Sequence, residues 1–463
     1  MNNQDKATKK QNAIPPEGLH DARVLGMPRM LLLGLQHMFA MFGSTILVPA
    51  LTGLSVSATL FFAGVGTLLF HLLTRFKVPA FLGSSFAFLG GYFAVSTWAA
   101  DRGITDAAAL LPYACFGVAC SGLIYLLMAA FIKAFGPERI IKFFPAVVTG
   151  PIIISIGLCL ASTAIESCSD NWFIAVCAII IIVIANIFGR GMIRIIPIML
   201  GIFGASAIAV IVQLTGGAEV FAPESLEAFA RAPWIGLPFR YEDSVFSIFS
   251  GNTDTGLLIT SVVTIVPIAL ATIIEHIGDI TAISFTVGRN YIADPGLHNT
   301  MLGDGLATIL ASLFGAPANT TYGENTGVLT ISRVFDPRVI RIAAVFAILF
   351  SFSPKFAALI GLMPTSVIGG VSLILYGMIS AVGVRNFVES QTDFRKSRNI
   401  IVTALIICLS IGINYSTEGA INFTVGSVTI GFSGLAVGAL VGIFLNAVLP
   451  GKDKITYKKK EER

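Results

Sequence analysis

The chain has 463 residues, of which 55% are hydrophobic and only 12% charged, and its mean hydropathy is +0.84. A water-soluble domain of this size does not carry so little charge, so the composition excludes the soluble globular classes and indicates a protein that lives in lipid. The formal net charge of +4 is small, and we interpret it as a signal of membrane topology rather than of nucleic-acid binding.

Residues 1–28 form a polar tail that contains Lys6, Lys9 and Lys10 and lacks the short apolar core of a removable signal peptide. We expect this tail to lie in the cytoplasm and the first apolar run to start insertion. Residues 451–463 form a second charged tail. Its lysines favour contact with anionic membrane lipid, but its acidic residues favour a solvated tail, which we prefer.

Apolar runs of about 20 residues, each long enough for one helical span, follow one another from residue 29 to residue 450. Helices are expected because lipid offers no partner for free backbone groups, and a membrane barrel would alternate polar and apolar residues. We count about fourteen such runs. The sequence therefore predicts an all-α polytopic membrane protein with 14 transmembrane segments.

The basic residues predict the orientation of these spans. If both termini are cytoplasmic, all but four of the 30 lysine and arginine residues fall in inner loops or tails. The four exceptions are Arg102, Arg231, Arg240 and Lys355. Since this distribution obeys the positive-inside rule, an even number of spans is expected.

Two stretches, residues 144–157 and 363–376, resemble each other in sequence. The matched positions are Pro145 and Pro364, Val148 and Val367, and Gly150 and Gly369. The first stretch opens span five and the second opens span twelve, so the two copies cross the membrane in opposite directions. We predict a 7+7 inverted repeat, with chance similarity between apolar helices as the alternative.

Small and polar residues interrupt the apolar pattern in two further places, residues 79–86 of span three and residues 317–324 of span ten. In inverted-repeat transporters, interrupted spans present free backbone amides and helix N-termini at the middle of the membrane, where substrate binds. The alternative for each is a proline-kinked span buried among its neighbours.

Acidic side chains inside spans are costly and therefore point to function. Four are present: Glu275, Asp279, Asp304 and Glu324. Glu275 and Asp279 are separated by four positions and share one helix face, so proton coupling is their expected role. Asp304 fits a helix-bracing role almost as well. His37 in span one occupies the place that His276 occupies in the second half, and we predict that it partners a carboxylate in proton coupling. A histidine that packs against a backbone carbonyl is the alternative.

Five segments together resemble motifs of the nucleobase-ascorbate transporter family, and most of all its bacterial uracil permeases. They are residues 36–49 (QHMFAMFGSTILVP), 83–88 (GSSFAF), 275–278 (EHIG), 294–298 (DPGLH) and 319–327 (NTTYGENTG). The resemblance covers residues 30 to 450. It implies a bacterial inner-membrane protein with a core domain (29–135 and 256–361), a gate domain (136–215 and 362–450), an extracytoplasmic loop (216–255), and short antiparallel strands in spans three and ten.

The resemblance also implies a binding site for uracil. Glu275 and Glu324 would accept hydrogen bonds from the ring N–H groups, and backbone amides at Ser44, Phe86 and Gly323 would serve the ring carbonyls. Phe86 and Tyr322 would contact the ring, and Tyr376 would close over it from the gate domain. Members of this type are proton symporters and often dimerise through the gate domain, so we expect a homodimer of this kind. Our hypothesis for the mechanism is alternating access, with the proton as coupling ion and no metal or cofactor.

Other functions fit these residues less well. Asp279 stands where uracil permeases carry a second histidine, and purine-transporting relatives carry an aspartate at this position. A xanthine or uric acid permease is therefore the nearest alternative. Two glutamates in the site argue against an anion exchanger of the sulfate type, and a passive channel would need no titrating carboxylates. A membrane-embedded metalloprotease would need a second histidine four residues after His276, where Ile280 stands.

Overall fold

The computed structural model describes residue 15 and residues 18–100, 107–217, 220–221, 223–250, 253–417, 419–425 and 428–451. Within these residues, eight helical segments are long and apolar enough to cross a membrane. Helices α16 (Pro337–Ser351) and α17 (Pro354–Gly361) form a further candidate span, bent by 87°. The fold is thus mostly helical and of the multi-pass membrane type, while the count of 14 spans stays a prediction.

The first half of the chain is built from long apolar helices joined by short turns. Its elements are η1 (Ala22–Leu25), α2 (Met27–Thr52), α3 (Val56–Leu73), β1 (Leu82–Ser84), α4 (Leu89–Ala100), α5 (Ala107–Phe135), α6 (Pro137–Ile141), α7 (Ala146–Ser169), α8 (Trp172–Phe188), α9 (Met192–Ile195) and α10 (Pro197–Leu214). Local signals set the helix ends. Helix α2 has a proline in its first turn and is capped after Thr52 by Gly53, whose φ of 81° is left-handed.

The second half is also built from apolar helices, but short elements interrupt them more often. Its elements are α11 (Pro223–Arg231), η2 (Val245–Ser250), α12 (Thr255–Ile265), η3 (Val266–Ile268), α13 (Ala269–Val287), η4 (Ile292–Gly296), α14 (Leu297–Leu313), β2 (Asn319–Thr321), α15 (Gly323–Ser332), α16, α17, α18 (Thr365–Glu389), α19 (Ser397–Asn414), β3 (Ala420–Val425), β4 (Val428–Ser433) and α20 (Gly434–Val448). Pro267 lies in η3 between α12 and α13, where its missing N–H loosens the helix ladder.

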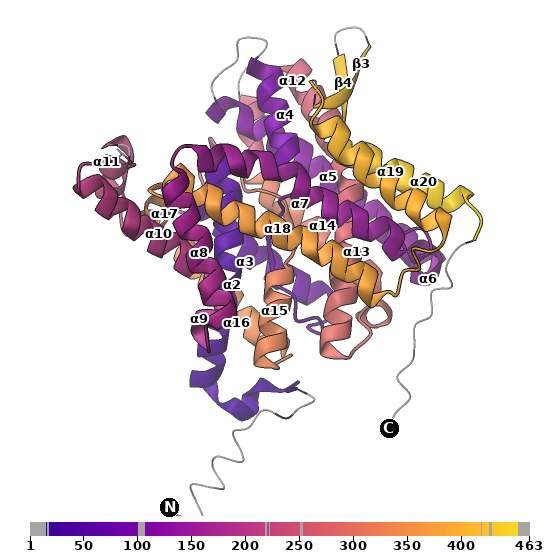
Figure 1. The fold of residues 1–463 in the computed structure, drawn as a ribbon, viewed down its shortest axis with the longest axis horizontal. Helices are drawn as coiled ribbons and strands as arrows, with labels where there is room; N and C mark the ends of the chain where they lie inside the picture. The colour runs from indigo at the N-terminus through magenta and orange to yellow at the C-terminus, as the bar shows by residue number, and fades with distance from the viewer. Residues whose placement is uncertain are drawn as a thin grey trace, which may run out of the picture.

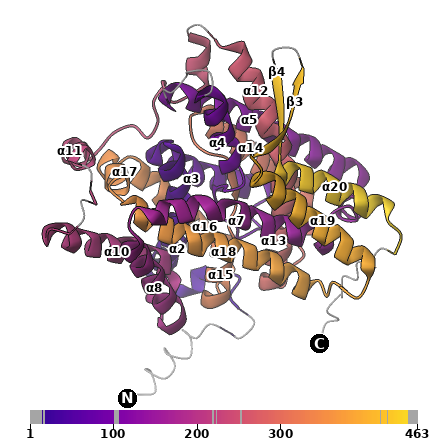
Figure 2. The ribbon, with the colours of Figure 1, turned by 45° about the horizontal axis from the view of Figure 1, so that its top comes forward.

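The helices pack in two groups. One contains α2, α3, α5, α12, α14 and α16, and the other contains α7, α8, α10, α18, α19 and α20. In the second group α7 and α18 lie side by side, with α8 and α10 near one end and α19 and α20 near the other (Figures 1 and 2). The contacts occur in three matched pairs. The contact of α3 with α16 matches that of α14 with α5, and the contact of α8 with α10 matches that of α19 with α20. The contact of α19 with α7 matches that of α18 with α8.

The two interrupted segments meet in a short antiparallel sheet. Strand β1 pairs with β2 in the register Leu82 to Thr321, Gly83 to Thr320 and Ser84 to Asn319. A Cβ atom on Gly83 would lie 2.6 Å from the ring of Tyr322, so this approach requires glycine. Helix α4 follows β1 and α15 follows β2, which brings the starts of two short helices close to the sheet.

Residues 216–255, predicted as an extracytoplasmic loop, contain the short helices α11 and η2. A second sheet was not predicted. Strands β3 and β4 form a second sheet, a hairpin that stands at the edge of the molecule beside α12 (Figure 1). Its β-branched and aromatic residues favour a strand, but within such an apolar chain they were indistinguishable from the end of a span.

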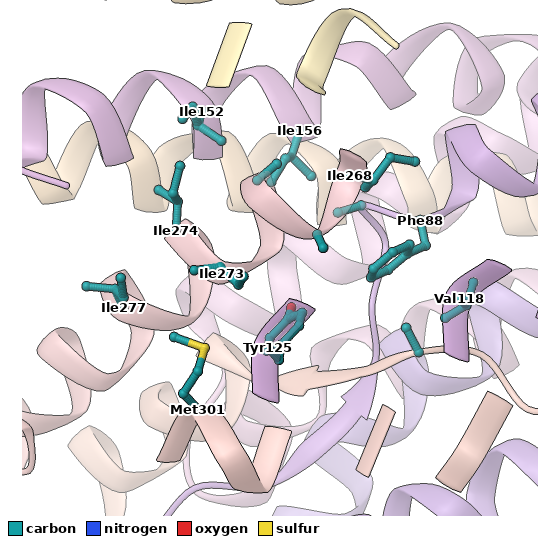
Figure 3. Packing of buried hydrophobic residues seen from close by; sticks show 14 of the residues in the cluster. Phe88, Val118, Tyr125, Ile152, Ile156, Ile268, Ile273, Ile274, Ile277 and Met301 are labelled. Atoms are coloured by element: carbon teal, nitrogen blue, oxygen red, sulfur yellow. The ribbon is translucent and has the colours of Figure 1, made fainter. Parts of the chain in front are cut away.

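Buried side chains join the two helix groups. Ile152 and Ile156 of α7 face Ile274 on α13 and Ile268 in the bend that precedes this helix (Figure 3). Tyr125 of α5 is also fully buried in this cluster. In lipid such close packing, rather than escape from water, holds helices together.

Candidate functional site

A cavity of about 300 Å³ is lined by residues from both helix groups. Six of the predicted site residues line it: Phe86, Glu275, Asp279, Tyr322, Gly323 and Glu324. Phe86 and residues 322–324 come from segments almost 240 residues apart in the chain, which the pairing of β1 with β2 brings together, while Glu275 and Asp279 come from α13. The size suits one small molecule, at the lower end of the usual range for ligand sites.

Glu324 lies in the first turn of α15, and its Oε1 accepts a hydrogen bond of 3.0 Å from the hydroxyl of Ser44. Ser44 is not in the cavity wall; it lies inside α2, where its N–H belongs to the helix ladder, so its hydroxyl rather than its amide is the group that reaches Glu324. Gly323 is the first residue of α15, and the N–H groups of a first helical turn have no partner within the helix. Together with the helix dipole, these amides favour an electron-rich ligand group.

Glu275 and Asp279 present two carboxyl groups from one face of α13 to the same cavity. Oδ2 of Asp279 accepts a hydrogen bond of 3.1 Å from Thr321 of β2. Oε2 of Glu275 is buried and has no hydrogen-bond partner among the described residues. A buried acceptor of this kind is the group that a ligand N–H would satisfy.

Aromatic rings flank these carboxyl groups. The hydroxyl of Tyr322 donates to the carbonyl of Ser84 at 2.8 Å, which fixes the ring against β1. The rings of Phe86 and Tyr376 meet edge to face, with centroids 5.7 Å apart. Tyr376 is 1% exposed and reaches Phe86 from α18 in the second helix group, but it is not itself part of the cavity wall.

His37 is fully buried in α2 but is not in the cavity wall. The amide nitrogen of Asn325 lies 3.2 Å from Nδ1 of His37 and donates to its backbone carbonyl at 3.1 Å. Among the described residues, no carboxylate forms a hydrogen bond or an ion pair with His37. His37 therefore contacts α15 through the residue next to Glu324, rather than through Glu324 itself.

His276 turns away from the cavity toward α14. Its Nδ1 lies 3.1 Å from Oδ2 of Asp304, and its Nε2 lies 3.1 Å from the hydroxyl of Thr300. Both His276 and Asp304 are completely buried. This pair ties α13 to α14, as expected for Asp304 in a bracing role.

The model of the Permease family (Xan_ur_permease) matches residues 28–419. The chain belongs to this family. A uracil permease of Bacillus caldolyticus is 38% identical over 439 residues, which cover 93% of this chain and 94% of that protein. A uracil permease of Bacillus subtilis (strain 168) is 39% identical over 429 residues, or 90% of this chain and 91% of that protein. These matches confirm the predicted resemblance and make the permease a membrane transporter rather than an enzyme.

Solved structures show the same fold at low sequence identity. The transmembrane domain of the cyanobacterial bicarbonate transporter BicA overlays on the permease with a TM-score of 0.60 and 13% identity, over 93% of this chain and 99% of that domain. The structure of SLC26A9 gives a TM-score of 0.57 and 13% identity, over 90% of this chain and 64% of the other. At this identity the likeness concerns the fold alone.

One wall of the permease's cavity was missed by sequence reasoning. It consists mainly of apolar residues from α7, α10 and α18, such as Ile153, Ile198 and Met378, with Asn186 and Arg194 as polar members. An apolar side chain that faces a cavity has the same sequence pattern as one that faces lipid. For Asn186 a signal existed, because it is a lone amide within the apolar run of α8.

Proposed function

We propose that this permease takes up uracil together with protons across the bacterial cytoplasmic membrane. The observation that carries the proposal is that Glu275 and Glu324 line one cavity beside Phe86 and Tyr322. Uracil is a flat ring with two N–H donors, which two carboxyl groups complement, and its faces suit aromatic neighbours. The relatives named as uracil permeases support this substrate.

The remaining polar groups fit the ring carbonyls of uracil. The first-turn N–H of Gly323 and the backbone N–H of Phe86 would donate to them, while Ser44 would hold Glu324 in place through its hydroxyl. Tyr376 would close the site by its contact with Phe86. A nucleobase bound in this way would be enclosed by residues of both helix groups.

We assign proton coupling to Glu275 and Asp279. Two carboxyl groups on one buried helix face repel each other when both are ionised, so a proton taken up there favours binding of a neutral ring. His37 would take part only through Asn325, the neighbour of Glu324. Coupling needs no metal or cofactor in this scheme.

We propose alternating access between the two helix groups, taken as a core domain (29–135 and 256–361) and a gate domain (136–215 and 362–450). A cavity lined by both groups supports this, because relative movement would open it to either side. The matched helix contacts support a 7+7 inverted repeat, since each helix in one contact of a pair corresponds to a helix seven spans away in the other contact. Both termini would then be cytoplasmic, and the gate domain would form the homodimer.

Uptake of radiolabelled uracil by cells that lack their own uracil permease tests the proposal. We expect uptake that a protonophore abolishes, that Glu275→Gln loses, and that excess xanthine does not inhibit. If xanthine competes and uracil is carried poorly, the permease carries purines, as the aspartate at position 279 indicates. If uptake persists with a protonophore, the proton is not the coupling ion.

A further inference from the structure

The β1–β2 sheet has two outer edges that need hydrogen-bond partners inside the membrane. Tyr322 donates its N–H to the carbonyl of Phe81 at 3.0 Å, and Ser85 donates to Ala318 at 2.8 Å. Antiparallel strands alternate between bonded and non-bonded pairs, so the backbone groups of Leu82 point away from β2. In lipid or in a dry protein interior such groups must be satisfied by side chains.

One threonine bonds the first residue on the outer edge of each strand, while Tyr322 donates to the carbonyl of Ser84 further along β1. Thr67 of α3 accepts the N–H of Leu82 at 2.9 Å and donates to the Leu82 carbonyl at 3.3 Å. Thr308 of α14 donates to the carbonyl of Asn319 at 2.9 Å. Both threonines are completely buried, and each one holds the first residue of its strand.

The two threonines occupy related places. Helices α3 and α14 pack against each other on the sheet, and each supplies one hydroxyl to one strand. Leu82 lies four residues before Phe86, and Asn319 lies five residues before Glu324. A shift of either strand would therefore move a residue that lines the cavity.

We propose that Thr67 and Thr308 are positioning residues, whose hydroxyl groups set the places of Phe86 and Glu324 in the substrate site. The inference rests on the proposed function. It also distinguishes these residues from Thr59 on α3, which is buried as well (2% exposed) but, among the described residues, donates only to the carbonyl of Ser55 at the start of its own helix, at 2.7 Å. Thr59 is thus a matched control that keeps the helix and lacks the contact with the strand.

The test compares Thr67→Val and Thr308→Val with Thr67→Ser, Thr308→Ser and Thr59→Val. Valine keeps the shape and removes the hydroxyl, which leaves a buried backbone group without its partner. We expect each of the two strand-facing valine variants to raise the KM of uracil uptake about tenfold, with Vmax per folded copy little changed. The serine variants and Thr59→Val should keep the wild-type KM.

Two outcomes overturn the inference. One is a wild-type KM in both Thr67→Val and Thr308→Val. The other is a raised KM in the serine variants, because serine keeps the hydroxyl and lacks only the methyl group, so the effect would come from methyl packing. The KM of the serine variants tests the inference even if the valine variants do not fold. If the wild type carries xanthine and not uracil, the proposed function fails, and the same KM comparison is made with xanthine.

Discussion

Ser44 of α2 donates a hydrogen bond of 3.0 Å to Oε1 of Glu324, the second residue of α15. The bond joins the first long helix of the chain to the broken segment that follows β2. It fixes one oxygen of a carboxyl group that lines the cavity, and a hydrogen bond to an ionised acceptor is among the stronger ones in proteins.

Ser44→Ala should weaken uracil binding about tenfold, because Glu324 loses a bond worth about 1.5–3 kcal/mol when the acceptor is charged. The KM of uracil uptake checks this. Ser155→Ala in α7 is the control, since the Ser155 hydroxyl donates to its own helix at Pro151. An unchanged KM in Ser44→Ala would show that the bond does not organise the site.

Asp279→Asn should separate binding from coupling. An asparagine oxygen can still accept the hydrogen bond of Thr321, so exchange of external for internal uracil should continue. The amide cannot take up a proton, so accumulation should fall to the level that wild-type cells reach with a protonophore. Full accumulation in the variant would exclude Asp279 from proton coupling.

Gly83→Ala should destabilise the β1–β2 sheet by about 1–3 kcal/mol through overpacking. The new Cβ would lie 2.6 Å from the Tyr322 ring and 2.7 Å from Oγ1 of Thr45. Thermal unfolding in detergent, together with uptake, measures the loss. Gly412→Ala is the control, because no atom of another described segment lies within 4 Å of a Cβ there and alanine favours a helix by about 1 kcal/mol.

Lys355→Met should release α11 from α17. The ammonium of Lys355 donates to the carbonyls of Phe229 at 2.6 Å and Ala230 at 3.0 Å, where α11 ends, and lies 4.5 Å from the Phe229 ring centroid. Methionine keeps the stem but loses all three interactions. Hydrogen exchange of residues 223–236 should accelerate.

Arg231→Met is the matched control for Lys355, because within the described part of the chain Arg231 pairs only with the exposed Glu227 of the same helix, and such surface pairs contribute little. Equal exchange in both variants would show that Lys355 does not hold α11.

Residues 18–26, here the N-terminal clip, should loosen in mild acid. Leu19 donates to the carbonyl of Arg333 at 2.8 Å, and Ala22 donates to Asp336 at 2.7 Å. Partial burial and the charge of Arg289 lower the pKa of His20. The neutral ring is therefore the docked form, so docking is strongest above the ordinary histidine pKa of about 6.5 and weakens as the pH falls below it.

Hydrogen-exchange protection of the clip between about pH 7.5 and about pH 5.5 measures this effect. Hydrogen bonds from Arg23 lower the pKa of Asp21, so Asp21 stays ionised and its contribution is lost only in stronger acid. His20→Gln should remove the pH dependence in this window. A pH-dependent clip in that variant would contradict the assignment to His20.

The sequence was most informative where a residue type conflicts with lipid. Carboxyl groups at Glu275, Asp279 and Glu324 are costly there, and all three line the cavity. The interrupted segments were found in the same way, because small and polar residues break an apolar run. The apolar spans themselves predicted helices such as α2 and α18 at nearly their observed positions.

The remaining features depend on tertiary register, which composition does not show. A threonine inside a span usually donates a hydrogen bond to a carbonyl of its own helix. The sequence therefore did not indicate that Thr67 and Thr308 contact the strands. The contact of His37 with Asn325 depends in the same way on how α2 meets α15. The β3–β4 hairpin was missed because its residues are as apolar as the spans on either side.

Titration of purified permease with uracil, by calorimetry, tests most directly whether Glu275 and Glu324 form the site. We predict binding by the wild type that weakens at least about tenfold in Glu275→Gln and in Glu324→Gln, since each amide replaces a charged acceptor by a neutral one. Uracil binding that is unchanged in both variants would contradict the account.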